Sequence, residues 1–587
     1  MGLIVPSALD TCATATNFVP GIDTNRGIRV GRWTPRAGFS GPLKKGRAWF
    51  SDSIYGDYNN TIHRGLPRGE DSNTYWALGK LIHAQANLTA GNILYGDLLL
   101  NVERENHTGM SALDPLETTL GRRSNEWLAS VKNTHALGSE SLVEVGFAAL
   151  NVLHRRTPQG SEPYTFSALG RRGNHFTSSR EAGRREQVFV NYYPPAFRAA
   201  GRHQIQMGGD VQHLSYDAAF QRSPYRTLSA AGWLVSETRF LGPGSFRLSN
   251  VLTSAYLHDQ WRPAEGLTVS LGVRQDWDRL VGRSAVSPRA AAAWIPFRGA
   301  RTKISGGYGV FYDASHLATL SQPLDQASVT IPYSSEGVPG MPYARVFQAG
   351  QHLALPRYGN WSASIERDFG RRVSAQVEWL RKRGRDGFVY AQLPQTIPGQ
   401  ADLRLSNLRR DSYDELALTL RQSFGDQYEW FASYVQSRAA SNAVLDIRVD
   451  QVYQAFDNTG RMPWDVPHRF LSWGYLPIPV QPGKWALAYL METRSGFPFA
   501  LLRDTGELSG APDSQRFPAN FDLNLHVERR IEFRGLRFAV RLGMNNVTGS
   551  RNASSVYNVI GSPKFLQYTG DEGRHVVVRL RFFGRRS

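Results

Sequence analysis

The chain has 587 residues, with 68 Lys and Arg against 50 Asp and Glu, which gives a formal net charge of +18. Its single cysteine, Cys12, excludes an intramolecular disulfide framework and a multi-cysteine zinc site. No apolar stretch reaches the roughly 18–20 residues of a membrane-spanning helix, which disfavours a helical membrane protein. The basic residues are scattered rather than gathered among stacking aromatic residues, so we expect no nucleic-acid partner.

The first part of the chain, residues 1–46, is rich in Gly, Thr and Ala and shows no sustained period. We expect an irregular N-terminal segment there. From residue 47 onward, strand-like blocks follow one another without an evident linker, which predicts one all-β architecture over 47–583 and a C-terminal tail at 584–587. The blocks lie near 47–58, 75–88, 92–103, 124–136, 140–153, 185–195, 202–214, 228–240, 249–262, 266–278, 286–297, 301–313, 360–369, 372–383, 413–424, 427–438, 468–479, 484–496, 519–530, 535–547 and 574–583.

The last three blocks show the pattern most clearly, because apolar and polar residues alternate along each of them. Successive side chains of a strand face opposite sides, so each block has one apolar face and one charged face. A sheet with one solvated face gives the same alternation, but these blocks approach the roughly 9–11 residues of a tilted strand that crosses a bilayer. The sequence therefore predicts a transmembrane antiparallel β-barrel of the outer-membrane type. The alternating apolar residues are Phe521, Leu523, Leu525 and Val527, then Leu536, Phe538, Val540 and Leu542, then Val576, Val578, Leu580 and Phe582.

The connections between the blocks alternate in length. Tight turns are expected at 262–266, 297–300, 369–371 and 424–426, whereas 104–122, 154–184, 314–358, 439–466, 497–517 and 548–572 are long. Short turns at one rim and long loops at the other are typical of outer-membrane barrels, whose long loops lie outside the cell. We therefore expect this protein in the bacterial cell outer membrane, in contact with its lipid.

The polar face of a barrel strand faces the lumen, and several arginines fall on that face. A basic lumen attracts anionic solutes or an acidic partner; the simpler interpretation is that these arginines pair with luminal Asp and Glu. The arginines expected to form a luminal basic face are Arg274, Arg421, Arg537, Arg541, Arg579 and Arg581.

Motifs for catalysis, cofactors or metals were sought without success. The glycine-rich residues 306–309 fall within a strand block, where small residues ease curvature, and adjacent strand residues such as His258 and Asp259 point to opposite faces. The carboxylates Asp446, Asp450, Asp457 and Asp465 share one long loop, but their spacing is not that of a calcium loop, and solvated loop charge is the expected role. We predict no catalytic residue, no cofactor, no metal ligand and no enzyme activity.

Several blocks carry a family resemblance. Residues 254–263 (SAYLHDQWRP) leading into 267–274 (LTVSLGVR) resemble a hairpin of TonB-dependent receptors of the Oar-like kind, which often carry a carboxypeptidase-regulatory-like domain. Residues 287–294 and 303–313 resemble the next hairpin, and 41–50 resemble the first strand. Further similar segments follow in the family's order, at 467–470 (PHRF), 495–499 (SGFPF), 545–548 (NNVT) and 561–563 (GSP).

The resemblance implies a barrel of 22 strands that takes up a bulky ligand across the outer membrane. In that family a plug precedes the barrel and a TonB complex supplies the energy, so a TonB partner is expected only if a plug and a TonB box are encoded upstream. Residues 1–46 are then the possible end of a plug. A plugless passive porin, a truncated non-functional fragment and a secreted β-rich binding protein stay open as alternatives, and the ligand is unknown.

The C-terminal strand has a separate role in the family, because the barrel-assembly machinery reads an aromatic residue at its end. Val576, Val578, Leu580, Phe582 and Phe583 resemble that strand. Residues 584–587 overhang it. We expect the assembly machinery to be a partner.

Overall fold

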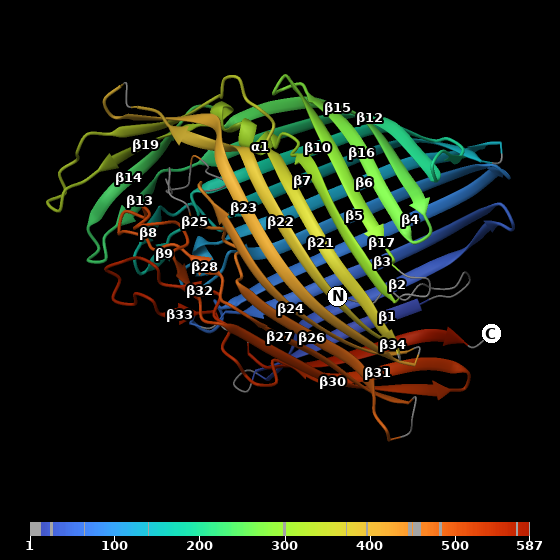
Figure 1. Cartoon of the computed structure of the whole chain (residues 1–587). Coiled ribbons are helices and arrows are strands. Elements are labelled where there is room, and N and C mark those ends of the chain that lie inside the picture. The colour runs from blue at the N-terminus through green and yellow to red at the C-terminus, as the bar shows by residue number, and fades with distance from the viewer. Residues whose placement is uncertain are drawn as a thin grey trace.

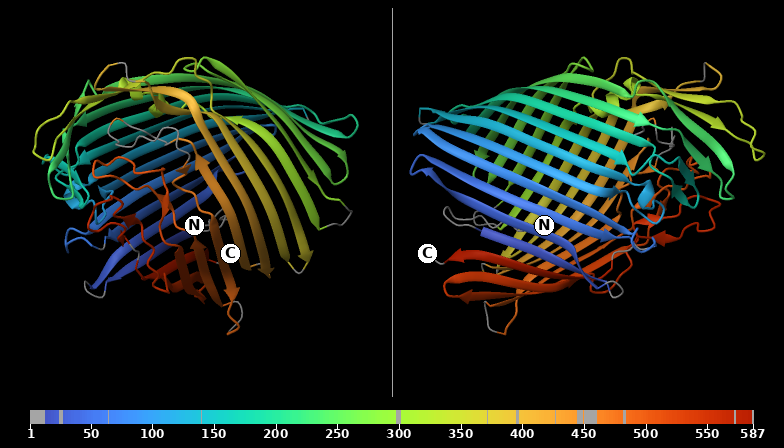
Figure 2. Two further views of the ribbon diagram at one scale, coloured as in Figure 1. Left: turned by 60° about the vertical axis from the view of Figure 1, so that its left-hand side comes forward. Right: turned by 180° about the vertical axis from the view of Figure 1, so that it is seen from behind.

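The computed structural model describes residues 13–585 except 24–26, 64, 139, 297–300, 371, 395–396, 426, 444–448, 450–459, 481–483 and 571–572. The described residues are almost entirely strand and loop, and a large curved sheet forms the wall of a barrel (Figures 1 and 2). None of the helices in the described part of the chain is long and apolar enough to cross a membrane.

The described residues form one sheet of 30 strands, and eight of these are short strands of the connections, so that 22 strands make up the wall. Neighbouring wall strands pair antiparallel, and β34 also pairs with β1, which closes the barrel. The wall strands, in order around the barrel, are β1 (Ala13–Asp23), β2 (Gly27–Lys44), β3 (Ala48–Ile62), β4 (Ser72–Thr89), β5 (Asn92–Thr108), β6 (Leu120–Leu137), β7 (Ser141–Pro158), β10 (Thr177–Tyr193), β12 (Arg202–Arg222), β15 (Ser245–Ala264), β16 (Leu267–Asp278), β17 (Arg283–Trp294), β18 (Thr302–Tyr312), β21 (Arg357–Gly370), β22 (Val373–Gln392), β23 (Gln400–Phe424), β24 (Tyr428–Ser441), β26 (His468–Pro477), β27 (Trp485–Arg494), β30 (Asn520–Phe533), β31 (Leu536–Asn545) and β34 (His575–Arg585).

The connections at the long-loop rim hold most of the remaining elements. Figure 1 shows them gathered at one end of the barrel, beside β13, β14 and β19. These elements are η1 (Leu116–Thr118), β8 (Tyr164–Ser167), β9 (Gly170–Arg172), β13 (Tyr225–Leu228), β14 (Leu234–Leu241), α1 (Leu317–Leu320), η2 (Gln322–Leu324), β19 (Ala327–Pro332), β20 (Tyr343–Gln348), β25 (Gly460–Arg461), β28 (Pro498–Phe499), β29 (Gln515–Arg516), β32 (Ser555–Val556) and β33 (Tyr568–Thr569). A further short strand, β11 (Phe197–Arg198), lies in the connection between β10 and β12 at the opposite rim.

The tight turns predicted at 262–266, 369–371 and 424–426 join consecutive wall strands at the opposite rim, whereas 297–300 lie outside the described residues. At the turn between β15 and β16, Gly266 has a φ of +78°, and a Cβ there would lie 2.6 Å from the carbonyl oxygen of Ile295. Only glycine fits this position, because other residues rarely adopt that φ and the added carbon has no room. The predicted all-β antiparallel barrel of about 22 strands is confirmed.

Three parts of the predicted organisation are wrong. Residues 13–23 and 27–44, expected to be irregular, form wall strands β1 and β2, and the block at 228–240 lies in the β13–β14 hairpin of a loop rather than in the wall. The lack of an apolar period hid β1, whose pairing partner β34 lies at the other end of the chain. The tail is also shorter than expected, since β34 extends to Arg585.

Candidate functional site

The two faces of the wall differ in polarity, which indicates which face meets lipid. On β30, β31 and β34 the register places apolar residues opposite one another in rows, and these side chains are exposed: Leu542 by 57%, Val527 by 39% and Leu580 by 38%. The alternate residues of the same strands are mostly polar. In a bilayer the apolar face must be the outer one, so the polar face lines the lumen.

The predicted luminal arginines all lie on this polar face, but they do not form one site. Arg274 donates to Asp276 over 2.8 Å and reaches Asp210 at 3.5 Å, and Arg421 is paired with Glu429. These two arginines lie on β16 and β23, away from the other four. The contacts show that Arg274 and Arg421 pair with luminal carboxylates. This is the simpler of the two roles expected for the luminal arginines.

The other four arginines lie together on β31 and β34, where the two strands pair. Glu528 of β30 is the acidic neighbour of two of them: Arg541 Nη2 lies 2.7 Å and Arg581 Nη2 lies 3.5 Å from Glu528 Oε2. The Glu528 side chain is only 1% exposed, and it also accepts a hydrogen bond from the Tyr475 hydroxyl over 2.8 Å. Arg579 lies directly opposite Arg541 in the register. This part of the lumen therefore carries more positive than negative charge.

The predicted assembly strand is β34, which closes the barrel. Its apolar residues Val576, Val578, Leu580 and Phe582 lie opposite Met544, Leu542, Val540 and Phe538 of β31. The rings of Phe538 and Phe582 are 6.2 Å apart between centroids. The backbone of Phe583 belongs to β34, whereas its side chain lies outside the described part. An apolar outward row that ends on an aromatic residue agrees with the expected role, which stays a prediction.

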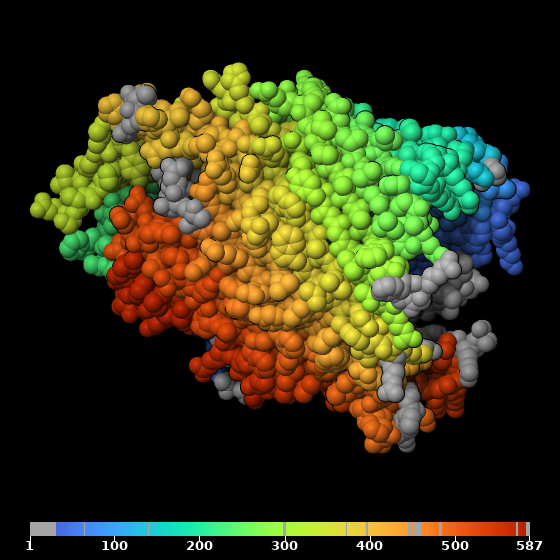
Figure 3. Space-filling view, viewed as in Figure 1, coloured from blue at the N-terminus to red at the C-terminus, as the bar shows by residue number. Residues whose placement is uncertain are grey.

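The long loops pack against one another over the mouth of the barrel. Ala168, Leu502 and Val559, from the three connections after β7, β27 and β31, form one buried cluster, with exposures of 2%, 8% and 5%. Leu502 and Val559 are also joined as a parallel β-bridge. Because β7 lies far around the wall from β27 and β31, the loops of distant strands meet. In Figure 3 the orange and red loop segments lie together at the left-hand end of the molecule.

A second buried cluster stands above the wall on β20, β22 and β23. Leu403 is fully buried, and the Tyr390 hydroxyl donates to the carbonyl oxygen of Thr319 over 2.7 Å, which fixes α1 to this cluster. Phe347 packs edge-on against Tyr390 at 4.8 Å between centroids. β22 and β23 continue well past the length needed to cross a bilayer, with 20 and 25 residues, and hold this cluster outside it.

Two ion pairs with buried carboxylates also hold the loops in place. Arg222 donates both terminal nitrogens to Asp325, over 2.8 and 2.9 Å, and their side chains are 1% and 3% exposed. Arg516 pairs with Asp465, whose side chain is 3% exposed and accepts the backbone N–H of Ala439. The expectation that Asp465 is a solvated loop charge is therefore wrong, because this partner, 51 residues further along the chain, satisfies it. Asp446, Asp450 and Asp457 lie outside the described residues.

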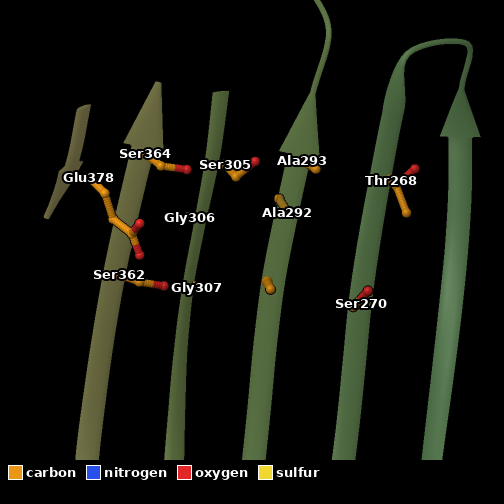
Figure 4. A pocket seen from close by; sticks show the side chains of 11 residues that line it. Thr268, Ser270, Ala292, Ala293, Ser305, Gly306, Gly307, Ser362, Ser364 and Glu378 are labelled. Carbon is orange, nitrogen blue, oxygen red and sulfur yellow. The ribbon is translucent and has the colours of Figure 1, made fainter. Parts of the chain in front are cut away.

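The inner wall also has a bare hollow of about 220 Å³ across β16, β17, β18 and β21. Figure 4 shows that small side chains line it, among them Ser270, Ser305 and Ser362, with the Glu378 carboxylate at one side. Gly307 lies in its floor, where a Cβ would come within 3.0 Å of Ala291. The sequence predicts that these glycines ease the curvature of the strand. It does not predict the hollow, because the hollow depends on how four strands are aligned.

Two further residues are where strand geometry predicts them. Asp259 does not contact His258, since its carboxylate lies 2.6 Å from Nδ1 of His203 on the neighbouring strand. This pair is near the short-turn rim, where Phe197, His203 and Trp261 stack. Within the described ranges, no group of three or more His, Cys, Asp or Glu side chains is arranged to hold a metal ion.

Comparison with known proteins agrees with this architecture. Residues 281–523 match the family described as "Outer membrane beta barrel domain". No curated protein matches the sequence. The fold matches solved structures over nearly the whole chain, but at low sequence identity. Such a match shows a shared architecture and says nothing about a shared ligand.

Three of these structures are examples. The outer membrane transporter YddB from Escherichia coli is 13% identical with a TM-score of 0.67, and the match covers 98% of this chain and 81% of that one. A mutant of the ferric enterobactin receptor PfeA from Pseudomonas aeruginosa is 13% identical with a TM-score of 0.69, over 98% and 80%. The siderophore receptor PirA from Acinetobacter baumannii is 14% identical with a TM-score of 0.67, over 97% and 80%. The chain is thus an outer-membrane β-barrel of bacterial type with the fold of TonB-dependent receptors.

Proposed function

We propose that this chain is the barrel portion of a TonB-dependent receptor and that it takes up a bulky ligand across the outer membrane. The observation that supports this most is closure of the wall with 22 strands. Barrels of about 16–18 strands leave an open aqueous channel, whereas barrels of about 22 strands are transporters whose lumen is plugged. The strand number therefore favours selective uptake over free diffusion.

The mouth supports the same proposal. Free diffusion needs an unobstructed entrance, but here loops from distant parts of the wall share the buried cluster of Ala168, Leu502 and Val559. Such packing holds the loops in defined positions from which their side chains contact a ligand. In this proposal the loops select the ligand, and a plug in the lumen, coupled to a TonB complex, admits it.

The first experiment determines what the cell makes. The natural product is purified from outer membranes, and its intact mass and N-terminal sequence are measured. A product with a plug and a TonB box ahead of this sequence supports energy-coupled uptake. A product recovered in a soluble fraction without detergent contradicts the membrane function and favours a secreted binding protein.

The second experiment separates uptake from passive flow. The natural product and the 587-residue chain are each reconstituted in planar lipid bilayers, and their ion conductance is compared. The proposal expects the natural product to be closed. A steadily open natural product contradicts it and favours a passive porin, and comparison with the 587-residue chain shows whether a further segment closes the lumen.

A further inference from the structure

Four arginines lie side by side across the adjacent strands β5, β6, β7 and β10. The register places Arg104 opposite Arg123, then Arg123 opposite Arg155, then Arg155 opposite Arg180. All four side chains are exposed. We call these four residues the arginine row.

The arginine row is on the outer face of the barrel. Arg104 alternates with the luminal Glu103 and Glu105 and shares its face with Val102 and Leu100. The row is also near the long-loop rim, since Arg104 and Arg123 flank the connection between β5 and β6. The row therefore lies where the apolar outer surface gives way to the headgroups of the outer leaflet.

The luminal arginines next to the row, one position along the same strands, each have an acidic partner. Arg122 lies 3.0 Å from Glu103, and Arg156 lies 3.4 Å from Glu181. The side chains of these four arginines make no hydrogen bond or ion pair within the described part of the chain. Arg104 has only an aromatic neighbour, with its guanidinium 5.2 Å from the centroid of Trp76.

Two acidic residues on the outer face of the neighbouring strands β10 and β12 already have partners. Asp217 lies 2.6 Å from Arg247, and Glu186 lies 3.5 Å from His213. Elsewhere on the outer face, arginines do form ion pairs with carboxylates. Arg381 and Arg383 both contact Asp414, at 2.7 and 2.8 Å. The shortage of negative charge is thus a property of the arginine row rather than of outward arginines in general.

An uncompensated row of this kind is unfavourable, because like charges directly opposite one another on a sheet repel. The missing negative charge must come from outside the chain. At this height on the outer face, the available anions are lipid headgroups, and the guanidinium fork matches the geometry of a phosphate, with which it forms bidentate charge-assisted hydrogen bonds.

We propose that the arginine row binds the phosphate groups of an outer-leaflet glycolipid. The bound lipid supplies the negative charge that the wall lacks, and its acyl chains lie along the apolar residues below the row. This contact fixes the lipid to one sector of the barrel, over β5, β6, β7 and β10.

The test compares two double variants of the full chain in detergent. R123Q/R155Q removes the centre of the row, and R367Q/R529Q removes two exposed outward arginines near the short-turn rim, beside Phe369 and Trp485. Each protein is titrated with bisphosphorylated lipid A, and the bound lipid is counted by native mass spectrometry. Retention of heat-modifiable migration on gels shows that each variant is folded.

We expect R123Q/R155Q to bind bisphosphorylated lipid A at least about tenfold more weakly than the unaltered chain, since charge-assisted contacts to phosphate are lost. R367Q/R529Q should bind as the unaltered chain does. Lipid A stripped of its phosphates should bind weakly to all three proteins.

Three outcomes overturn the proposal. One is equal affinity of R123Q/R155Q and the unaltered chain for bisphosphorylated lipid A. Another is equal binding of the lipid with and without its phosphates. The last is that inorganic phosphate displaces the lipid at equal concentration, which would make the row a site for free phosphate.

Discussion

A single buried carboxylate organises the most basic part of the lumen. Glu528 accepts bonds from Tyr475 and Arg541 and lies near Arg581, although its side chain is only 1% exposed. Strand alternation places these residues on the inner face. It gives no sign that Glu528 is the shared partner, because that depends on how four strands are aligned.

Replacing Glu528 with Gln should destabilise the barrel. The substitution removes the anion that Arg541 contacts at 2.7 Å, and breaking a buried ion pair from one side costs about 3–5 kcal/mol. The free energy of unfolding in urea, measured in lipid vesicles, checks this. As a control, Glu532→Gln changes an exposed carboxylate four positions along the same strand face and should stay within about 0.5 kcal/mol. Equal effects of the two substitutions would show that Glu528 has no special role.

Asp513, in the loop after β27, should make that loop sensitive to pH. Burial raises the pKa of this carboxyl above its usual value, and the residue also has a φ of +50°. A carboxyl whose pKa is raised by folding favours the folded loop below its unfolded pKa of about 3.9, and that contribution is lost as the pH rises through the raised pKa. Protease cleavage of the loop should therefore increase from pH 4 to neutral pH.

The variant Asp513→Asn should flatten that dependence, because asparagine carries no charge and tolerates a positive φ. The comparison is the cleavage rate of the two proteins across the same pH range. An unchanged pH profile in the variant would assign the effect to another group.

At the scale of elements, the seam between β34 and β1 decides whether the wall is closed. The register there joins Thr14 to Phe582 and Phe18 to Val578. β1 comes from a segment without an apolar period, and this is why the sequence predicts the barrel to begin only at residue 47. The edge of β34 exposes backbone N–H and C=O groups that need hydrogen-bond partners. Pairing with this edge makes the segment a strand, although its own sequence has no strand period.

A disulfide across the seam tests its register. In a chain carrying Cys12→Ser, cysteines replacing Thr16 and Leu580, which lie directly opposite one another, should oxidise to a cross-link in the membrane. The product migrates differently on non-reducing gels. Cysteines at Thr16 and Val576, four residues further along β34, should not form one. Equal cross-linking of both pairs, or of neither, would contradict the seam.

At the scale of the whole molecule, long loops from distant parts of the wall pack against one another. The cluster of Ala168, Leu502 and Val559 joins three connections, and the ion pair of Arg222 and Asp325 joins the end of β12 to the loop before β19. Under the proposed function, a ligand that enters the lumen passes these loops, so their packing bears on uptake as well as on stability.

A charge placed in the loop cluster should open the mouth. Val559 is 5% exposed and the adjacent Ile560 is 42% exposed, so Val559→Asp buries an unpaired carboxylate whereas Ile560→Asp leaves it in solvent. We expect faster external protease cleavage of the loops in Val559→Asp only, with the barrel still resistant. Equal cleavage of both variants would mean that the cluster does not hold the loops.

The sequence by itself determined the class of this protein and the order of most wall strands. Alternation along a strand and glycine at tight turns are local properties, so they can be read without knowing which segments pair. The residues 521–527 and 536–542, for example, have the facing predicted for them. The same local pattern misassigned 228–240 to the wall, because alternation does not say which strand a block pairs with.

Only the tertiary structure decided what depends on pairing between distant segments. Closure of β34 on β1, the burial of Asp465 against Arg516 and the meeting of Leu502 with Val559 each join residues that are far apart in the chain. The arginine row is of the same kind, since its four members are unremarkable in the sequence and become neighbours only in register. The pairing of all the wall strands sets the register, and the register decides which charged side chains become neighbours.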